Sequence, residues 1–212
     1  LSIDDFIKSS RVRLEVLPDP SSLFHHMARS MADEILANNR AGRPTRWILP
    51  VGPVGQYPLL VNICNQEHIS WKNVHTFNMD EYCDWQGRPI PADHPLSFRG
   101  FMKRAVFSQL DPALRIPSSQ VHFPDPLHLD EISQNIRAVG GIDTCYGGIG
   151  LNGHVAFNEP PRLLSGQVTA EEFGASLTRL VPLTPESIIM NGTRNMGGNL
   201  ADFPPMGVTL GM

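Results

Sequence analysis

Short apolar runs that alternate with stretches of helical spacing constrain the fold of this chain more than any other feature. Three of these runs are Trp47–Leu49, Val74–Phe77 and Ile142–Tyr146, each of the length of a buried strand. Between them, apolar residues recur every three or four positions, as they do in amphipathic helices. Because strands that alternate with helices form crossover units, this order predicts an α/β fold with a mainly parallel sheet.

The remaining elements follow from the same spacing and from turn residues. Helices are predicted over 22–39, 59–64, 97–110, 127–139 and 185–191, and further strands over 13–17, 121–123, 177–183 and 207–211. Residues 161–175 are polar and contain Gly and Ser, so they are interpreted as a mobile lid.

Polar turns follow three of the predicted strands, at 51–56, 78–82 and 147–159. In a parallel sheet, ligands bind beyond the carboxyl ends of the strands. We therefore expect the three turns to meet in one crevice, which is the candidate site.

The turn at 147–159 carries the sharpest candidate, His154. Gly150 and Gly153 let the backbone adopt positive φ and approach a ligand closely. An imidazole is suited to acid–base work near neutral pH, and Asn152 and Glu159 can orient its ring. The alternative is that His154 is a hydrogen-bonded structural residue and that its polar neighbours cap the turn. The position of His154 in a glycine turn after a strand favours the functional interpretation.

Asp80 and Glu81 follow the strand at 74–77. One carboxylate that faces the crevice can act as a general base. Adjacent side chains diverge, so the two carboxylates are not expected to share one proton. The alternative is that the pair caps the next element.

The turn at 51–56 lies between a predicted strand and a predicted helix, so its backbone N–H groups can face an anion. Its candidate binding residues are Val51, Gly52, Gly55 and Gln56. The turn has neither the Gly-Lys-Ser/Thr of a nucleotide-binding P-loop nor the Gly-x-Gly-x-x-Gly of a dinucleotide site. Pro53 removes one donor from it.

Composition excludes several classes of protein. The net charge of −4 and the absence of a Lys/Arg-rich block argue against a nucleic-acid partner. No apolar run approaches the roughly 20 residues of a membrane helix. The eight scattered histidines and three cysteines have no metal-site spacing, so no metal and no cofactor are expected. The odd cysteine count fits a cytoplasmic protein. The oligomeric state stays open, a homo-oligomer included.

Three stretches in order resemble the glucosamine-6-phosphate deaminase (isomerase) family. They are Phe77–Tyr82 (FNMDEY), His94–Phe98 (HPLSF) and Gly148–Pro160 (GIGLNGHVAFNEP). The similarity runs from about residue 13 to 184, and the last motif is long and specific. The related 6-phosphogluconolactonases share the glycine–histidine turn but do not usually carry Phe-Asn-Glu-Pro after it.

The resemblance implies a three-layer, Rossmann-like α/β/α fold and a metal-independent aldose–ketose isomerisation with loss of ammonia. It implies that Asp80 moves a proton between C2 and C1 of the opened sugar phosphate and that His154 assists ring opening. Asn152 and Glu159 would hold and tune the imidazole, and Glu81 would support the loop.

The sequence also departs from the family pattern. The phosphate loop of the family normally reads Ser/Thr-Gly-Gly/Ser-Thr-Pro, whereas 51–56 is shortened and has no hydroxyl group. The family's phosphate-binding arginine falls near Arg194. Residues 1–212 are expected to form one domain without the C-terminal part that carries a phosphate-binding lysine.

The function that the resemblance implies is an amino-sugar-phosphate isomerase/deaminase, with a substrate that the altered loop leaves open. Two alternatives remain. One is a lactonase-type hydrolase on the same fold, and the other is a non-catalytic sugar-phosphate sensor.

Overall fold

A computed structural model describes residues 2–160 and 168–212 of the chain. Its helices are α1 (Ile3–Ser9), α2 (Pro20–Arg40), α3 (Gln56–Gln66), α4 (Phe98–Met102), α5 (Glu131–Ala138), α6 (Ala170–Gly174) and α7 (Pro185–Asn195), with a π-helical turn η1 (Lys103–Phe107) and a 3-10 turn η2 (Ser118–Gln120). Its strands are β1 (Thr45–Leu49), β2 (Val74–Asn78), β3 (Asp80–Cys83), β4 (Val121–His122), β5 (Thr144–Cys145), β6 (Arg179–Pro182) and β7 (Met206–Thr209).

The first sheet has the strand order β4-β2-β1-β5, and every pairing in it is parallel. In the central pair, Thr45 lies opposite Val74 and Leu49 lies opposite Asn78. The strands predicted at 47–49, 74–77, 121–123 and 142–146 all belong to this sheet. The prediction of an α/β fold with a mainly parallel sheet is therefore confirmed.

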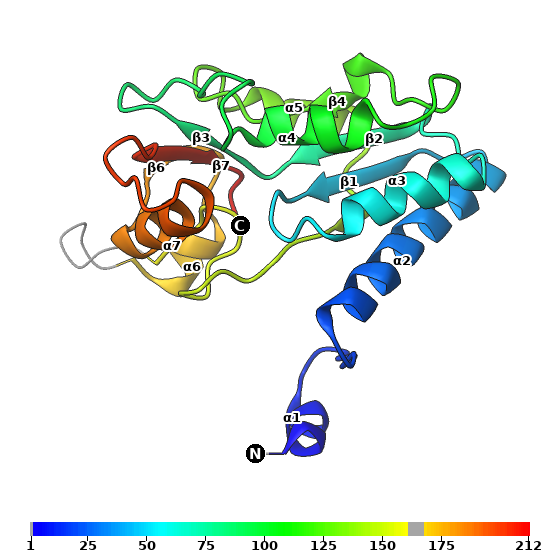
Figure 1. Cartoon of the computed structure of the whole chain (residues 1–212), viewed down its shortest axis with the longest axis horizontal. Coiled ribbons are helices and arrows are strands. Elements are labelled where there is room, and N and C mark those ends of the chain that lie inside the picture. Colours follow the sequence, from blue (N-terminus) through cyan, green and yellow to red (C-terminus); the bar gives the residue numbers. More distant parts are fainter. Residues whose placement is uncertain (1, 161–167) are drawn as a thin grey trace.

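Side chains that alternate along the strands bury both faces of this sheet. Trp47 and Leu49 of β1 point into a cluster with α2, α3 and η1, while Ile48 points into another cluster with α5. Figure 1 shows α2 and α3 on one side of β1 and β2 and α5 on the other. The three layers follow from this alternation.

The second sheet is antiparallel and has the order β3-β7-β6. Figure 1 shows it beside the parallel sheet, next to α6 and α7. It corrects the prediction of a polar turn at 78–82, because Asp80 to Cys83 form a fully buried strand. Asp80 pairs with Thr209, a partner so distant in sequence that local spacing does not indicate it.

Other segments also differ from their predictions. Residues 13–17 form no strand, since they pair with no other segment and Val16 is 54% exposed. The helix expected at 97–110 is α-helical only to Met102 and then π-helical. Of the predicted lid, residues 161–167 lie outside the described part, and α6 forms within the rest. Within the described part, no helix is long and apolar enough to cross a membrane.

Candidate active site

Residues from three distant segments meet where β2 passes into β3. Leu210 N donates to Met79 O at 2.8 Å, and Thr209 Oγ1 accepts from Phe157 N at 3.3 Å. Because Thr209 also pairs with Asp80, the end of β7 joins Asp80 to the segment that carries Glu159. The turn at 51–56 contacts the same group, since a Cβ built on Gly148 would lie 2.9 Å from Gly52 O.

His154 is held from one side of its ring. Its Nδ1 lies 2.5 Å from Asn152 Oδ1 and 3.6 Å from Glu159 Oε1. Both neighbours present oxygen atoms, so Nδ1 carries the proton and donates it, and Nε2 is the acceptor of the neutral ring. The side chain of His154 is 19% exposed, which leaves the ring accessible at the edge of the site.

Glu159 is anchored at the amino end of α7. Thr184 N donates to its Oε2 at 2.6 Å, and the Ser187 hydroxyl donates to its Oε1. The Thr184 side chain also caps α7 by accepting from Ser187 N. A carboxylate at a helix amino terminus is stabilised by the free N–H groups and the helix dipole. Glu159 therefore ties the histidine turn to a rigid element.

The glycines in this turn allow close packing. Gly153 has a φ of +83°, a conformation that side chains other than glycine rarely adopt. A Cβ on Gly150 would clash with the imidazole of His154, which lies directly over it. Gly150 N also donates to His154 O at 2.8 Å, which closes the turn. These two glycines shape the turn around the ring.

Asp80 is a buried carboxyl on β3, only 6% exposed. Burial raises its pKa well above the ordinary value of 3.8, and the charge of Glu81 raises it further. A carboxylate with a raised pKa is a stronger base than an ordinary aspartate. Its environment is of the kind that tunes a general base.

Glu81, its neighbour, faces a different set of groups. Its carboxylate accepts from Phe98 N at 2.9 Å, Arg99 N at 2.8 Å and the Ser97 hydroxyl at 3.1 Å. It thus satisfies the free N–H groups at the start of α4. Burial still raises its pKa. These contacts occupy both of its oxygens, in keeping with a supporting residue.

The candidate anion loop at 51–56 connects β1 to α3. Gly52 has a φ of +144°, and Gly55 packs its backbone against the ring of Phe24. Gln56, the first residue of α3, is fully buried and donates from Nε2 to Pro53 O at 2.7 Å. Val51 is half-buried at the start of the loop.

Arg194 lies at the opposite end of α7 from the residues that bind Glu159. It lies exposed in the last turn of α7, ten residues after Thr184, which contacts Glu159. A rise of about 1.5 Å per residue separates the two backbones by roughly 15 Å. Its position is thus the far end of the helix that anchors the site.

Three residues of the site have no role in the sequence-based hypothesis: Thr184, Ser187 and Thr209. The Thr-Pro-Glu-Ser pattern at 184–187 is a helix-start signal, but it does not reveal that a distant glutamate binds there. Among the described residues, no group of three or more His, Cys, Asp or Glu side chains is arranged to hold a metal ion.

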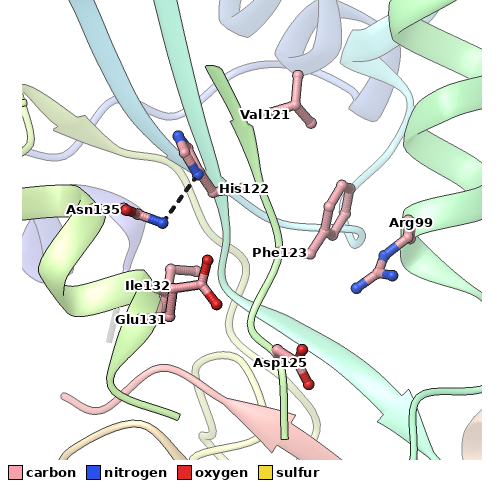
Figure 2. Close-up of a pocket in the computed structure, with 8 residues that line it drawn as sticks. All are labelled: Arg99, Val121, His122, Phe123, Asp125, Glu131, Ile132 and Asn135. Atoms are coloured by element: carbon pink, nitrogen blue, oxygen red, sulfur yellow. Dashed lines mark hydrogen bonds between the residues drawn. The ribbon is translucent and has the colours of Figure 1, made fainter. Parts of the chain in front are cut away.

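A separate pocket of about 340 Å³ lies at the edge strand β4, and none of the predicted site residues lines it. Figure 2 shows Arg99 and Phe123 on one side of the β4 chain and His122, Glu131 and Asn135 on the other. The Arg99 guanidinium carbon lies 5.3 Å from the centre of the Phe123 ring. This pocket is distinct from the group around His154.

Comparison with known proteins gives relatives along almost the whole chain, although no protein-family model matches it. The chain is 36% identical over 210 residues to a glucosamine-6-phosphate deaminase of Parabacteroides distasonis, covering 95% of this chain and 70% of the relative. It is 33% identical over 210 residues to the enzyme of that name from Porphyromonas gingivalis W83, covering 95% and 72%.

Solved structures agree with the sequence relatives. A monomeric glucosamine-6-phosphate deaminase superposes with a TM-score of 0.73 and 25% identity, over 90% of this chain and 72% of that one. The 6-phosphogluconolactonase of Thermotoga maritima gives 0.61 at 19% identity, over 93% and 76%, and shows a shared Rossmann-like fold alone. With the motifs, the fold and these relatives in agreement, the chain belongs to the glucosamine-6-phosphate deaminase family.

Proposed function

We propose that this chain is an amino-sugar-phosphate isomerase/deaminase, which converts a substrate like glucosamine 6-phosphate into a ketose phosphate and ammonia. The observation that carries the proposal is that a buried carboxyl, Asp80, and a held imidazole, His154, lie on segments joined through Thr209. Relatives at 33–36% identity bear the name of this activity.

In the proposed reaction, His154 assists opening of the sugar ring. Asn152 and Glu159 hold the Nδ1 proton, so Nε2 is the atom that exchanges a proton with the ring oxygen or the hydroxyl on C1. Fixing the tautomer in this way leaves the lone pair of Nε2 available to accept a proton.

Asp80 then moves the proton that defines the isomerisation. Its carboxylate takes a proton from C2 of the open amino aldose while the aldehyde oxygen on C1 gains a proton, which gives an enolamine. The Asp80 carboxyl then returns its proton to C1, which leaves an iminium at C2. Water adds to that carbon, the C2–N bond breaks, and ammonia leaves as the ketone forms. Its raised pKa favours the first step, because a stronger base lowers the barrier to deprotonating carbon.

The phosphate is assigned to the loop at 51–56, next to the turn that contains Gly150 and Gly153. This loop precedes α3, so its N–H groups and the amino end of the helix favour an anion. The loop has no hydroxyl or charged side chain. The identity of the sugar phosphate that binds is therefore tested separately from the type of reaction.

A substrate panel tests this function. The purified chain is incubated with glucosamine 6-phosphate, other amino-sugar phosphates, their unphosphorylated forms and 6-phosphogluconolactone, and the products are identified. Ammonia with a ketose phosphate supports the proposal. A sugar acid without ammonia would instead make the chain a lactonase, and ligand-induced stabilisation without any product would make it a sensor.

We place the protein in the cytoplasm, because Cys64, Cys83 and Cys145 are all free thiols, as is usual in a reducing compartment. The proposed chemistry uses residues of one chain only. Sedimentation at several concentrations would show whether copies associate.

A further inference from the structure

Residues 51–55 of the loop at 51–56 offer an anion nothing but their backbone. Val51, Gly52, Pro53, Val54 and Gly55 have no side chain that donates a hydrogen bond. Backbone N–H groups bind an anion well when several of them point toward the same place. The direction of these groups is therefore the property that decides how well the loop binds a phosphate.

Two buried side chains at the start of α3 fix the carbonyl groups of this loop. The Tyr57 hydroxyl donates to Pro50 O at 2.5 Å, and Gln56 Nε2 donates to Pro53 O at 2.7 Å. The backbone N–H of Tyr57 donates to Val54 O at 3.1 Å. Both side chains have no exposed surface, so the carbonyls of Pro50 and Pro53 that they hold point toward the protein interior. The Val54 carbonyl points toward the first turn of α3, where the Tyr57 N–H binds it.

Because the peptide group is planar, these contacts also determine where the backbone N–H groups of the loop point. In a planar trans peptide, the C=O of one residue and the N–H of the next point in opposite directions. With the carbonyls of Pro50 and Pro53 turned inward, the N–H groups of Val51 and Val54 turn outward. The N–H of Gly55 points away from the first turn of α3, opposite to the Val54 carbonyl. None of these three donates to a residue in the described part of the chain, and α3 has no side-chain cap.

We propose that Gln56 and Tyr57 are positioning residues that aim these N–H groups at the phosphate of the substrate. The inference rests on the proposed function, in which this loop binds that phosphate. Neither side chain touches the substrate. They replace, from the inside of the loop, the order that hydroxyl side chains within the loop would otherwise provide.

Two conservative variants test the proposal. Tyr57→Phe removes one hydroxyl group. Gln56→Leu removes the side-chain amide and keeps a side chain of similar size; the Oε1 atom that is lost has no partner among the described residues. Each variant is expected to raise KM for glucosamine 6-phosphate about five- to tenfold, the effect of losing one hydrogen bond, while kcat stays within about twofold. The inhibition constant of inorganic phosphate should rise by the same factor.

Thr76→Val is the matched control. Thr76 is equally buried, its hydroxyl has no partner among the described residues, and it lies on β2 outside the loop. The control should leave KM and phosphate inhibition unchanged. Thermal unfolding of all three variants confirms that the fold is intact, and if Tyr57→Phe does not fold, Gln56→Leu decides.

Unchanged KM and phosphate inhibition in folded variants, or a loss confined to kcat, would overturn the proposal. Phosphate binding by calorimetry separates this failure from failure of the proposed function, because it needs no turnover. A wild type without activity whose phosphate binding still weakens in both variants would reject the reaction and keep the role of Gln56 and Tyr57.

Discussion

Asp80 and Glu81 are neighbours in sequence, and their surroundings give them different chemistry. Glu81 accepts three hydrogen bonds from the start of α4, whereas Asp80 lies buried on β3 with its pKa raised well above 3.8. Alternation along the strand sends the two side chains to opposite faces. The sequence predicts that a single carboxylate acts on the substrate, and the contacts of Glu81 favour our proposal that Asp80 is that residue.

The raised pKa of Asp80 makes a prediction about stability. The folded chain binds the Asp80 proton more tightly than the unfolded chain, so the contribution of Asp80 to stability is greatest below about pH 3.8 and falls as pH rises toward the folded-state pKa. Asp80→Asn removes this cost. We expect the variant to have a higher unfolding temperature than wild type at pH 7.5, by about 2–4 °C per kcal/mol gained, with the difference shrinking toward pH 4.

Asp84→Asn is the control, because its expected change in stability at pH 7.5 has the opposite sign. The backbone N–H of Arg88 and the other donors around Asp84 lower the pKa of its carboxyl, so it stabilises the fold above pH 3.8 and loses that effect as pH falls through the folded-state pKa. This variant should be less stable at pH 7.5 and converge on wild type in acid. An Asp80→Asn variant that melts below wild type at pH 7.5 would contradict the account of Asp80.

The histidine turn at 147–159 and the candidate anion loop at 51–56 pack as one unit. A Cβ on Gly148 would lie 2.9 Å from Gly52 O and 3.0 Å from Pro53 Cδ, both parts of the other loop's backbone or ring. Gly148→Ala should therefore push the two loops apart. We expect at least a tenfold loss of kcat/KM, because small displacements of positioned groups are costly to catalysis.

Gly147→Ala is the control for that substitution. At Gly147, a new Cβ meets only Met79 Cε at 3.6 Å and Val155 Cγ1 at 3.9 Å, which are ordinary contacts. In steady-state kinetics, kcat/KM of Gly147→Ala should be at least tenfold higher than that of Gly148→Ala. Equal kinetics in both would show that the loops do not depend on this contact.

The elements of the parallel sheet could be predicted from the sequence because their apolar spacing is local. The strand β3 could not, since its first residues are two carboxylic acids and its partner β7 lies more than a hundred residues later. The same limit applies within the site. His154 and Asn152 are two positions apart and could be paired by inspection, whereas Ser187 reaches Glu159 only through the folded position of α7.

The chain has a packed body and an amino-terminal arm, residues 2–16, that projects from it. Figure 1 shows α1 away from the rest of the fold. No described residue of 2–16 is buried, and Glu15 reaches the body through His26 at 3.6 Å, a contact between half-exposed side chains. Such a pair contributes little to stability.

Deleting residues 1–16 should therefore leave the unfolding temperature within about 2 °C of wild type, which corresponds to less than about 1 kcal/mol for a chain of this size. Ile35→Ala, in the buried cluster of α2, should cost about 2–5 kcal/mol in the same assay. A deletion as harmful as Ile35→Ala would mean that the arm belongs to the folded body.

In the proposed reaction, Asp80 is the base of an amino-sugar-phosphate deaminase. We would test this role by measuring ammonia release from glucosamine 6-phosphate by wild type and by Asp80→Asn, with substrate binding measured in parallel by calorimetry. We expect release by wild type, and in the variant a loss of at least about a hundredfold in kcat with binding retained. Comparable ammonia release by the two proteins would contradict the account.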